Sequence, residues 1–326
     1  MKPSQLVKAL EYCVETKVPM FIWGPPGIGK SSIVRQFAHA RGMQLIDIRL
    51  LHFDTVDLRG VPFIQGGKTC WAAPSFFPSD GQGILFLDEL NSASPQVQAA
   101  AYQLVLDRRL GEYVLPPDWL VIGAGNNEGE GVVFRMPPPL ANRFVHVDLE
   151  PDVDDWTEWA LKANLAFEVI AFIRFRPELL FKFSAKEKAF PTPRSWERVS
   201  MLLPLIKQPE GLEVVQGIVG KGPGAEFYGF LKVFSELPSF EEILLDPENA
   251  PVPVESSARY AVSALIAQKT TPDVFDRVLT YLYRLPEEYC VFAVKAALCR
   301  NPSIAKTRAF CDFAVRHKHL ILPELS

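Results

Sequence analysis

One stretch of the sequence, GPPGIGKS at residues 24–31, constrains the fold of this chain more than any other. The apolar residues Phe21, Ile22 and Trp23 come directly before it, and a pattern typical of a helix follows it as far as Arg41. A strand that leads through a glycine-rich loop into a helix is the setting in which G-x-x-x-x-G-K-[ST] binds phosphate. A chance glycine turn is the alternative, and the flanking strand and helix favour the phosphate loop.

The predicted loop contributes both backbone and side-chain groups to a nucleotide site. Its glycines let successive backbone N–H groups point at one anion, and the N-terminus of the following helix adds a positive potential. We expect Lys30 to reach the β and γ phosphates and the Ser31 hydroxyl to hold Mg²⁺. The predicted ATP-binding residues are Gly24, Pro25, Pro26, Gly27, Ile28, Gly29, Lys30, Ser31 and Ser32.

A second element of the site is predicted in the segment ILFLDE at residues 84–89. Its apolar part is expected to form a buried strand, and Asp88 at the carboxyl end of that strand to hold the metal with Ser31. We expect Glu89 to polarise the water that attacks the γ-phosphate. Two acids after a strand are common in solvated loops, and it is their combination with the phosphate loop that favours a catalytic role.

Apolar segments and helical patterns alternate through the first 150 residues. Helices are predicted at 4–16, 31–41 and 95–107, hairpins at 60–75 and 108–119, and strands at 18–23, 43–50, 83–89, 120–126 and 145–150. Strands that alternate with helices and are apolar on both faces predict a parallel sheet covered on both sides. The expected fold class is therefore α/β.

The composition changes after Pro151. Helical patterns dominate as far as Ser235, a proline-rich stretch fills 245–256, and two or three further helices are expected between 257 and 322. The expected organisation is a nucleotide-binding core at 1–150, a helical lid at 151–244, a linker at 245–256 and a helical C-terminal extension at 257–326.

Composition and charge argue against several classes of protein. The formal net charge of −4 offers no general attraction for nucleic acid or anionic lipid. Five scattered cysteines without a CxxC pair indicate reduced thiols rather than a disulfide framework or a zinc site. The first residues lack a signal-peptide pattern, and no stretch reaches the roughly 18 apolar residues of a membrane span. We expect a cytoplasmic protein that does not contact membranes.

The order of several motifs resembles that of AAA+ ATPases of the MoxR-like group, over at least residues 15–235. These motifs are GPPGIGKS, DLRGVP, WAAPSFFP, GILFLDELNSASPQVQAA, IGAGNN, PPLANRF and PTPRSWERVS. The resemblance implies a three-layer αβα core with a parallel sheet, followed by a helical lid. It also implies a homo-oligomer, a hexameric ring in which each nucleotide lies between neighbouring subunits.

The resemblance assigns catalytic roles to three further residues. Asn126 resembles the sensor-1 residue, which contacts the γ-phosphate or positions water. The family more often has proline after this residue, where this chain has Asn127. The alignment of the sensor-1 motif with this sequence is therefore open by one residue. Arg143 resembles the arginine finger that acts on the neighbouring subunit's nucleotide. Arg135 is the rival candidate, and an ion pair of Arg143 with the lid is the structural alternative.

Arg194, in PTPRSWE, resembles the sensor-2 residue that reaches the γ-phosphate from the lid of the same subunit. The structural alternative is an arginine at a helix start that pairs with Glu197.

The two predicted hairpins resemble inserts that face the pore or the upper surface of such rings. Their aromatic and basic side chains suit contact with a substrate polypeptide or strand, and packing against each other and against a neighbour is an equal alternative. The residues concerned are Phe63, Lys68, Trp71, Arg108, Arg109 and Tyr113.

These features predict Mg²⁺-dependent ATP hydrolysis that drives a chaperone-like remodelling or activation of a partner protein, for which the resemblance suggests a companion with a von Willebrand factor A domain. The alternative is a nucleic-acid translocase or defence-system motor, against which stand the acidic charge balance and the lack of an appended DNA-binding motif. A nucleotide-switched scaffold that does not hydrolyse ATP conflicts with the full catalytic set.

Overall fold

A computed structural model describes residues 1–127, 134–184, 186–206 and 210–317. The end of the predicted C-terminal extension, 318–326, lies outside these residues. The chain divides into two compact units, Met1–Asp152 and Val153–Ser326, and each has its own hydrophobic core. Within the described residues, no helix combines the length and the apolar character needed to cross a bilayer.

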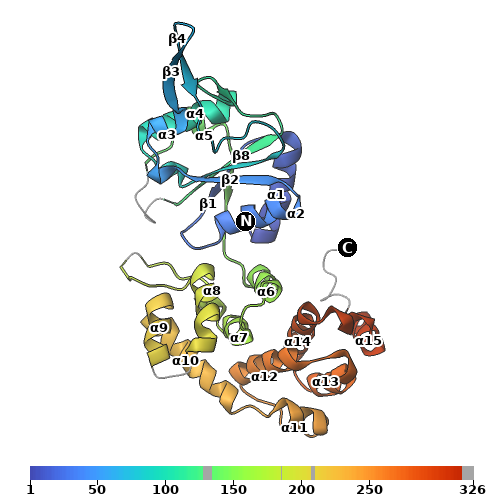
Figure 1. Ribbon diagram of the computed structural model, residues 1–326. Helices are drawn as coiled ribbons and strands as arrows, with labels where there is room; N and C mark the ends of the chain where they lie inside the picture. Colours follow the sequence, from blue (N-terminus) through green and yellow to red (C-terminus); the bar gives the residue numbers. More distant parts are fainter. Residues whose placement is uncertain (128–133, 185, 207–209, 318–326) are drawn as a thin grey trace. The chain divides into compact units, whose positions relative to one another are not determined.

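The first unit, coloured blue to green in Figure 1, is built on a parallel sheet of five strands in the order β2-β5-β8-β1-β9. The strands are β1 (Met20–Trp23), β2 (Gln44–Arg49), β5 (Gly83–Asp88), β8 (Trp119–Gly125) and β9 (Val145–Asp148). β5 and β8 are buried along their whole length, as expected for central strands of a sheet that is covered on both faces. The parallel sheet predicted from the sequence is confirmed.

Helices cover both faces of this sheet. They are α1 (Pro3–Thr16), α2 (Lys30–Ala40), α3 (Thr55–Arg59), α4 (Pro95–Asp107) and α5 (Pro138–Ala141). Because successive strand residues point to opposite faces, Phe86 and Ile122 join a core with α1 and α2, whereas Leu85 and Val121 join a second core with α4 and α5. The predicted three-layer αβα arrangement is therefore confirmed.

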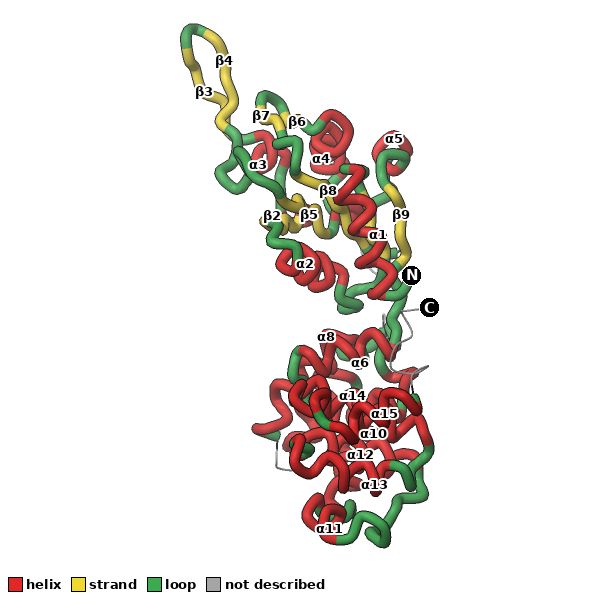
Figure 2. The backbone as a smooth tube through the Cα atoms, turned by 90° about the vertical axis from the view of Figure 1, so that its right-hand side faces the viewer, coloured by secondary structure: helices red, strands yellow, loops and turns green. Residues whose placement is uncertain are grey.

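Two antiparallel hairpins extend from this layered core, as the sequence predicted (Figure 2). The first joins β3 (Val61–Gln65) to β4 (Lys68–Ala72), and the second joins β6 (Arg109–Leu110) to β7 (Tyr113–Val114). Gly66 and Gly67 turn the first hairpin with φ of 59° and 74°, which glycine adopts without steric cost. Trp71 N donates a hydrogen bond to Glu112 Oε2 over 3.1 Å and so connects the two hairpins.

The second unit is helical. Its helices are α6 (Val153–Lys162), α7 (Phe167–Phe175), α8 (Pro193–Leu202), α9 (Glu210–Val219), α10 (Lys221–Ser235), α11 (Phe240–Leu245), α12 (Ser256–Lys269), α13 (Phe275–Leu282), α14 (Glu287–Arg300) and α15 (Arg308–Arg316). Phe172 of α7 belongs to the same hydrophobic core as Ala264 of α12 and Phe292 of α14. After residue 256 the described chain forms four α-helices, more than the two or three expected from the sequence.

Candidate functional site

The predicted phosphate loop connects β1 to α2 and has a backbone conformation suited to an anion. Gly24, Gly27 and Gly29 have φ of 155°, 83° and 110°, values that other residues rarely adopt. A Cβ on Gly24 would lie 3.1 Å from the carbonyl oxygen of Leu149, which leaves little room for a side chain. Gly29 is the N-cap of α2 and offers no side-chain cap, so the first turn of the helix is suited to an anionic ligand.

Lys30 begins α2, and its side chain folds back over the loop. It is only 8% exposed, and its Nζ donates to the carbonyl oxygens of Gly24 and Pro25, the latter over 3.2 Å. Nζ also donates to Asn126 Oδ1 over 3.0 Å. A buried ammonium group needs such acceptors, and here they keep its charge beside the phosphate loop.

The two residues predicted to bind the metal are in direct contact. Ser31 Oγ donates a hydrogen bond to Asp88 Oδ2 over 2.8 Å, and Asp88, the last residue of β5, is 7% exposed. Asp47 on β2 adds a second carboxylate to this region. The pKa of Asp47 is raised above its ordinary value, chiefly by burial and then by the negative charge of Asp88. The guanidinium groups of Arg35 and Arg49 offset this rise only in part. Hydroxyl and carboxylate oxygens are the ligand types that Mg²⁺ prefers in proteins.

Glu89 follows Asp88 in an unusual backbone conformation. Its φ of 55° and ψ of 34° lie in the left-handed region, which costs a non-glycine residue on the order of 1–3 kcal/mol. Such residues cluster at functional sites. The Glu89 N–H donates to Asp88 Oδ1 over 3.0 Å. Among the described residues, the Glu89 carboxylate has no hydrogen-bond or ion-pair partner, which is consistent with a group that acts on a ligand.

Asn126 follows β8 and meets the other motifs at the carboxyl end of the sheet. Its side chain accepts the hydrogen bond from Lys30, and its carbonyl oxygen accepts one from Asn91 Nδ2 over 2.8 Å. Asn91 is 2% exposed, and its backbone carbonyl oxygen accepts a hydrogen bond from Phe134 N over 2.7 Å. Sequence reasoning missed Asn91. The only signal was a polar residue shortly after Glu89 in DELNSA.

Residues 19–144 match the sequence profile of the AAA domain, dynein-related subfamily. The matched segment includes the phosphate loop, Asp88, Glu89 and Asn126, which the structure brings to one edge of the sheet. Residues 19–144 are an AAA domain. The ATPase class predicted from the motifs is thereby confirmed.

Known proteins resemble part of this chain at low identity. Midasin from Giardia intestinalis is 27% identical over 179 residues, which are 52% of this chain and 4% of midasin. Denitrification regulatory protein NirQ from Stutzerimonas stutzeri is 28% identical over 169 residues, 47% of this chain and 61% of NirQ. The chain thus spans less than two thirds of either relative. The Thermotoga maritima RuvB Holliday junction branch migration motor aligns with a TM-score of 0.41 at 18% identity, over 78% of this chain and 79% of that chain.

Within the AAA domain, Arg143 lies far from the phosphate loop of its own chain. β9 runs parallel to β1, with Val145 opposite Met20. Arg143 precedes β9 and Gly24 follows β1, so the two residues lie beyond opposite ends of this strand pair, whose four residues span about 13 Å at roughly 3.3 Å per residue. The Arg143 side chain is exposed and has no hydrogen-bond or ion-pair partner among the described residues.

The rival, Arg135, lies toward the other end of the sheet. Its neighbour Phe134 forms a hydrogen bond with Asn91, and Asn91 forms one with Asn126 beside the phosphate loop. Arg135 is also exposed and without a hydrogen-bond or ion-pair partner in the described part of the chain. The two arginines therefore differ in position rather than in exposure.

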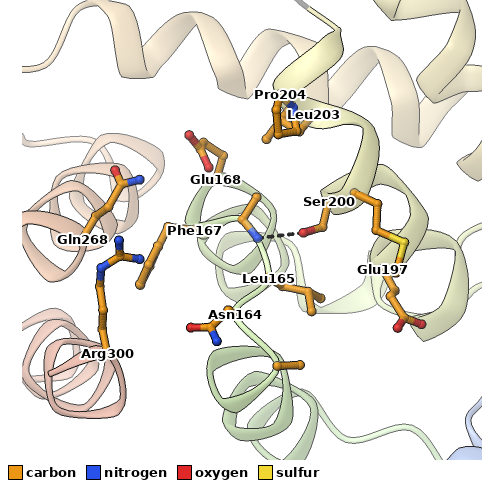
Figure 3. Close-up of a pocket in the computed structure, with 13 residues that line it drawn as sticks. Asn164, Leu165, Phe167, Glu168, Glu197, Ser200, Leu203, Pro204, Gln268 and Arg300 are labelled. Atoms are coloured by element: carbon orange, nitrogen blue, oxygen red, sulfur yellow. Dashed lines mark hydrogen bonds between the residues drawn. The ribbon is translucent and has the colours of Figure 1, made fainter. Parts of the chain in front are cut away.

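Arg194 belongs to the helical unit and lies in the first turn of α8. The helix is capped by the Thr192 hydroxyl, which accepts a hydrogen bond from Ser195 N over 3.0 Å. The exposed Arg194 forms no ion pair with Glu197 among the described residues of this unit. Glu197 and Ser200 instead line a pocket of about 570 Å³ beside α8 (Figure 3).

The hairpin residues fall into two groups. Four of them have exposed side chains: Phe63, Lys68, Trp71 and Arg109. Arg108 instead donates to the carbonyl oxygens of Pro116 and Trp119 over 2.6 and 2.8 Å.

Tyr113, the other inward-facing hairpin residue, is held by hydrogen bonding and stacking. Its hydroxyl donates to the Pro78 carbonyl oxygen over 2.8 Å, its ring stacks on Phe77, and burial raises its pKa to about 12. Arg108 and Tyr113 therefore stabilise the fold, and the first hairpin provides most of the exposed aromatic surface.

Proposed function

We propose that this chain is a ring-forming, MoxR-like AAA+ ATPase that hydrolyses ATP with Mg²⁺ and remodels or activates a partner protein. The observation that carries the proposal is the meeting of three motifs at one edge of the sheet. Ser31 is hydrogen-bonded to Asp88 and Lys30 to Asn126. Glu89 directly follows Asp88 in the chain. Open α/β sheets bind their ligands at this carboxyl edge.

In this proposal each group has one task. The backbone amides of residues 24–31 bind the phosphates, Lys30 neutralises their charge, and the oxygens of Ser31 and Asp88 hold Mg²⁺. The bound metal supplies charge neutralisation on the phosphate oxygens. Glu89 orients the attacking water, and Asn126 positions that water or contacts the γ-phosphate.

The position of Arg143 supports assembly into a ring. Because it lies beyond the opposite end of the β1–β9 strand pair from Gly24, it is poorly placed to serve its own phosphate loop. An exposed arginine without an ion pair is instead suited to stabilise charge on a neighbouring subunit's nucleotide. Arg194 would approach the γ-phosphate from the lid of its own subunit. We therefore propose a homo-oligomeric, hexameric ring with composite sites.

The proposed client is a protein. Val61, Phe63 and Ile64 of the first hairpin are 63%, 43% and 81% exposed, and such apolar surface suits protein contact. One relative, NirQ, is described as a regulatory protein, and the MoxR-like resemblance suggests a client with a von Willebrand factor A domain.

The decisive experiment is capture of the client by an E89Q variant loaded with ATP. We expect E89Q to bind ATP and to turn over about 10²-fold more slowly or worse, because it lacks the general base. E248Q, which changes an exposed glutamate of the helical unit, is the matched control. Wild-type turnover in E89Q would refute the site. Stimulation of the wild-type ATPase by single- or double-stranded DNA at physiological salt, without a captured protein, would favour the translocase alternative.

A further inference from the structure

His146, on β9, contacts both the strand that enters the phosphate loop and the turn that carries Arg143. Its Nδ1 accepts a hydrogen bond from Trp23 Nε1 over 2.8 Å, and its Nε2 lies 2.8 Å from the carbonyl oxygen of Ala141. Trp23 directly precedes Gly24, and Ala141 lies two residues before Arg143. One imidazole thus joins two segments of the AAA domain.

These two partners fix the tautomer of His146. An indole N–H can only donate a hydrogen bond, and a carbonyl oxygen can only accept one. The ring is therefore neutral, with its proton on Nε2, and Nε2 donates to Ala141 O. The rings of Phe21 and Phe144 lie 5.9 and 6.3 Å from the imidazole, so the ring is held by both packing and hydrogen bonds.

The backbone beneath Arg143 is fixed by the same contacts. Ala141 O also accepts from Phe144 N over 3.1 Å, and Arg143 N donates to Leu140 O over 3.1 Å. Phe144 is 7% exposed and meets the edge of Phe21 at 5.4 Å. The turn is therefore anchored on both sides of Arg143, while the arginine side chain itself is exposed.

We propose that His146 is a positioning residue that holds the Arg143 turn in place for the neighbouring subunit's nucleotide. This inference rests on the proposed function, because it requires that Arg143 acts in trans. A charge that stabilises a transition state is effective when it is in place before the reaction. The contact with Trp23 also connects the finger that a subunit supplies with the phosphate loop of that same subunit.

The test uses subunit mixing in the full-length chain. R143A retains its own site but lacks the finger, whereas K30A lacks a working site but retains the finger. We expect H146F to keep its affinity for ATP and to lower turnover about 10- to 100-fold, the scale of displacing a catalytic group by up to 1 Å. H146F should behave as a finger-deficient subunit, so K30A restores its activity and R143A does not.

H146Q provides the conservative rescue, because its amide N–H can still donate to Ala141 O. We expect it to recover most of the turnover lost in H146F. Restoration of H146F by R143A would overturn the proposal, since His146 would then serve its own site. Wild-type turnover in a folded H146F would overturn it as well.

Hydrogen exchange separates this proposal from the proposed function. In the nucleotide-free chain, H146F should speed exchange of the Arg143 and Phe144 amides, and unchanged exchange would refute the positioning role. If R143A and K30A do not restore each other, Arg143 does not act in trans and the proposed function is wrong, whatever the exchange result. Should H146F not fold, W23F removes the indole donor and keeps an aromatic ring at this position. Wild-type exchange together with wild-type turnover in W23F would refute the positioning role.

Discussion

Ser31 Oγ and Asp88 Oδ2 lie 2.8 Å apart and share a hydrogen bond, although 57 positions separate the two residues in the chain. The pair connects the start of α2 to the end of β5, so the two motifs predicted from the sequence form a single site. Both oxygens are hard ligands, and their contact leaves them close enough to bind one small cation.

S31A should therefore impair the use of Mg²⁺ more than the binding of the nucleotide. We expect the Mg²⁺ concentration for half-maximal ATPase activity to rise at least tenfold, since even an outer-shell partner of a metal is worth about that factor. Nucleotide binding without metal should change little. The measurement is a Mg²⁺ titration of ATPase activity. S79A, at an exposed serine, is the control, and an unshifted titration in S31A would exclude Ser31 as a metal ligand.

The two candidate fingers give a paired prediction. R143A should lower kcat by about 10³ or more at nearly unchanged KM for ATP, the scale known for removing an arginine finger. Wild-type activity per subunit should rise with protein concentration until assembly is complete. R135A is the matched control, because Arg135 is also exposed but lies toward the phosphate-loop end of the sheet. It should lose less activity. A larger loss in R135A than in R143A would reverse the assignment.

Close packing at the end of β8 gives a steric prediction. A Cβ at Gly125 would lie 2.1 Å from Asn91 Oδ1 and 2.9 Å from the Phe21 ring. G125A must therefore displace Asn91 and, with it, the carbonyl of Asn126. We expect a loss of stability of about 1–3 kcal/mol, typical of overpacking, together with reduced ATPase activity. Chemical denaturation and ATPase assays are the measurements.

The control for G125A is the same substitution at Gly217, a helical position with nothing within 4 Å of an added Cβ. G217A should be neutral or stabilising by up to about 1 kcal/mol, because alanine is the better helix former. Equal stability of G125A and G217A would show that Asn91 yields without cost.

Local motifs made the central site predictable. The glycines and Lys30 determine the strand-loop-helix structure, and Asp88 and Glu89 end an apolar run of the length typical of a buried strand. The meeting of these motifs then follows, because parallel strands place their carboxyl ends at one edge of the sheet. The left-handed backbone of Glu89 was not predictable, because no sequence signal identifies a strained non-glycine residue.

Residues that depend on pairing between distant segments were not predictable. His146 matters only because β9 pairs with β1 in the register that places it opposite Phe21. Tyr113 and Trp71 both looked like candidate gripping residues. Only the structure distinguishes Tyr113, which is bonded to Pro78, from the exposed Trp71. Periodicity identifies buried faces but not tertiary partners.

The helical unit should lose stability at alkaline pH through Tyr281. Its hydroxyl donates to Pro251 O over 2.8 Å, and burial raises its pKa to about 12. In the unfolded chain this phenol ionises near pH 10, as tyrosines ordinarily do. Between about pH 10 and 12 the unfolded state thus releases a proton that the folded state keeps, so stability falls as the pH rises, by about 2–3 kcal/mol from this residue.

Y281F isolates this contribution. At pH 8 it should be less stable than the wild type by about 1 kcal/mol, because a buried hydrogen bond is lost. That deficit should shrink and then reverse between about pH 10 and 12, since phenylalanine has no proton to release. Denaturant melts of both chains across this range are the measurement, and Y12F, which removes an exposed hydroxyl, should show no such crossing. Parallel pH profiles for Y281F and the wild type would mean that Tyr281 ionises equally in both states, against the burial and the hydrogen bond described above.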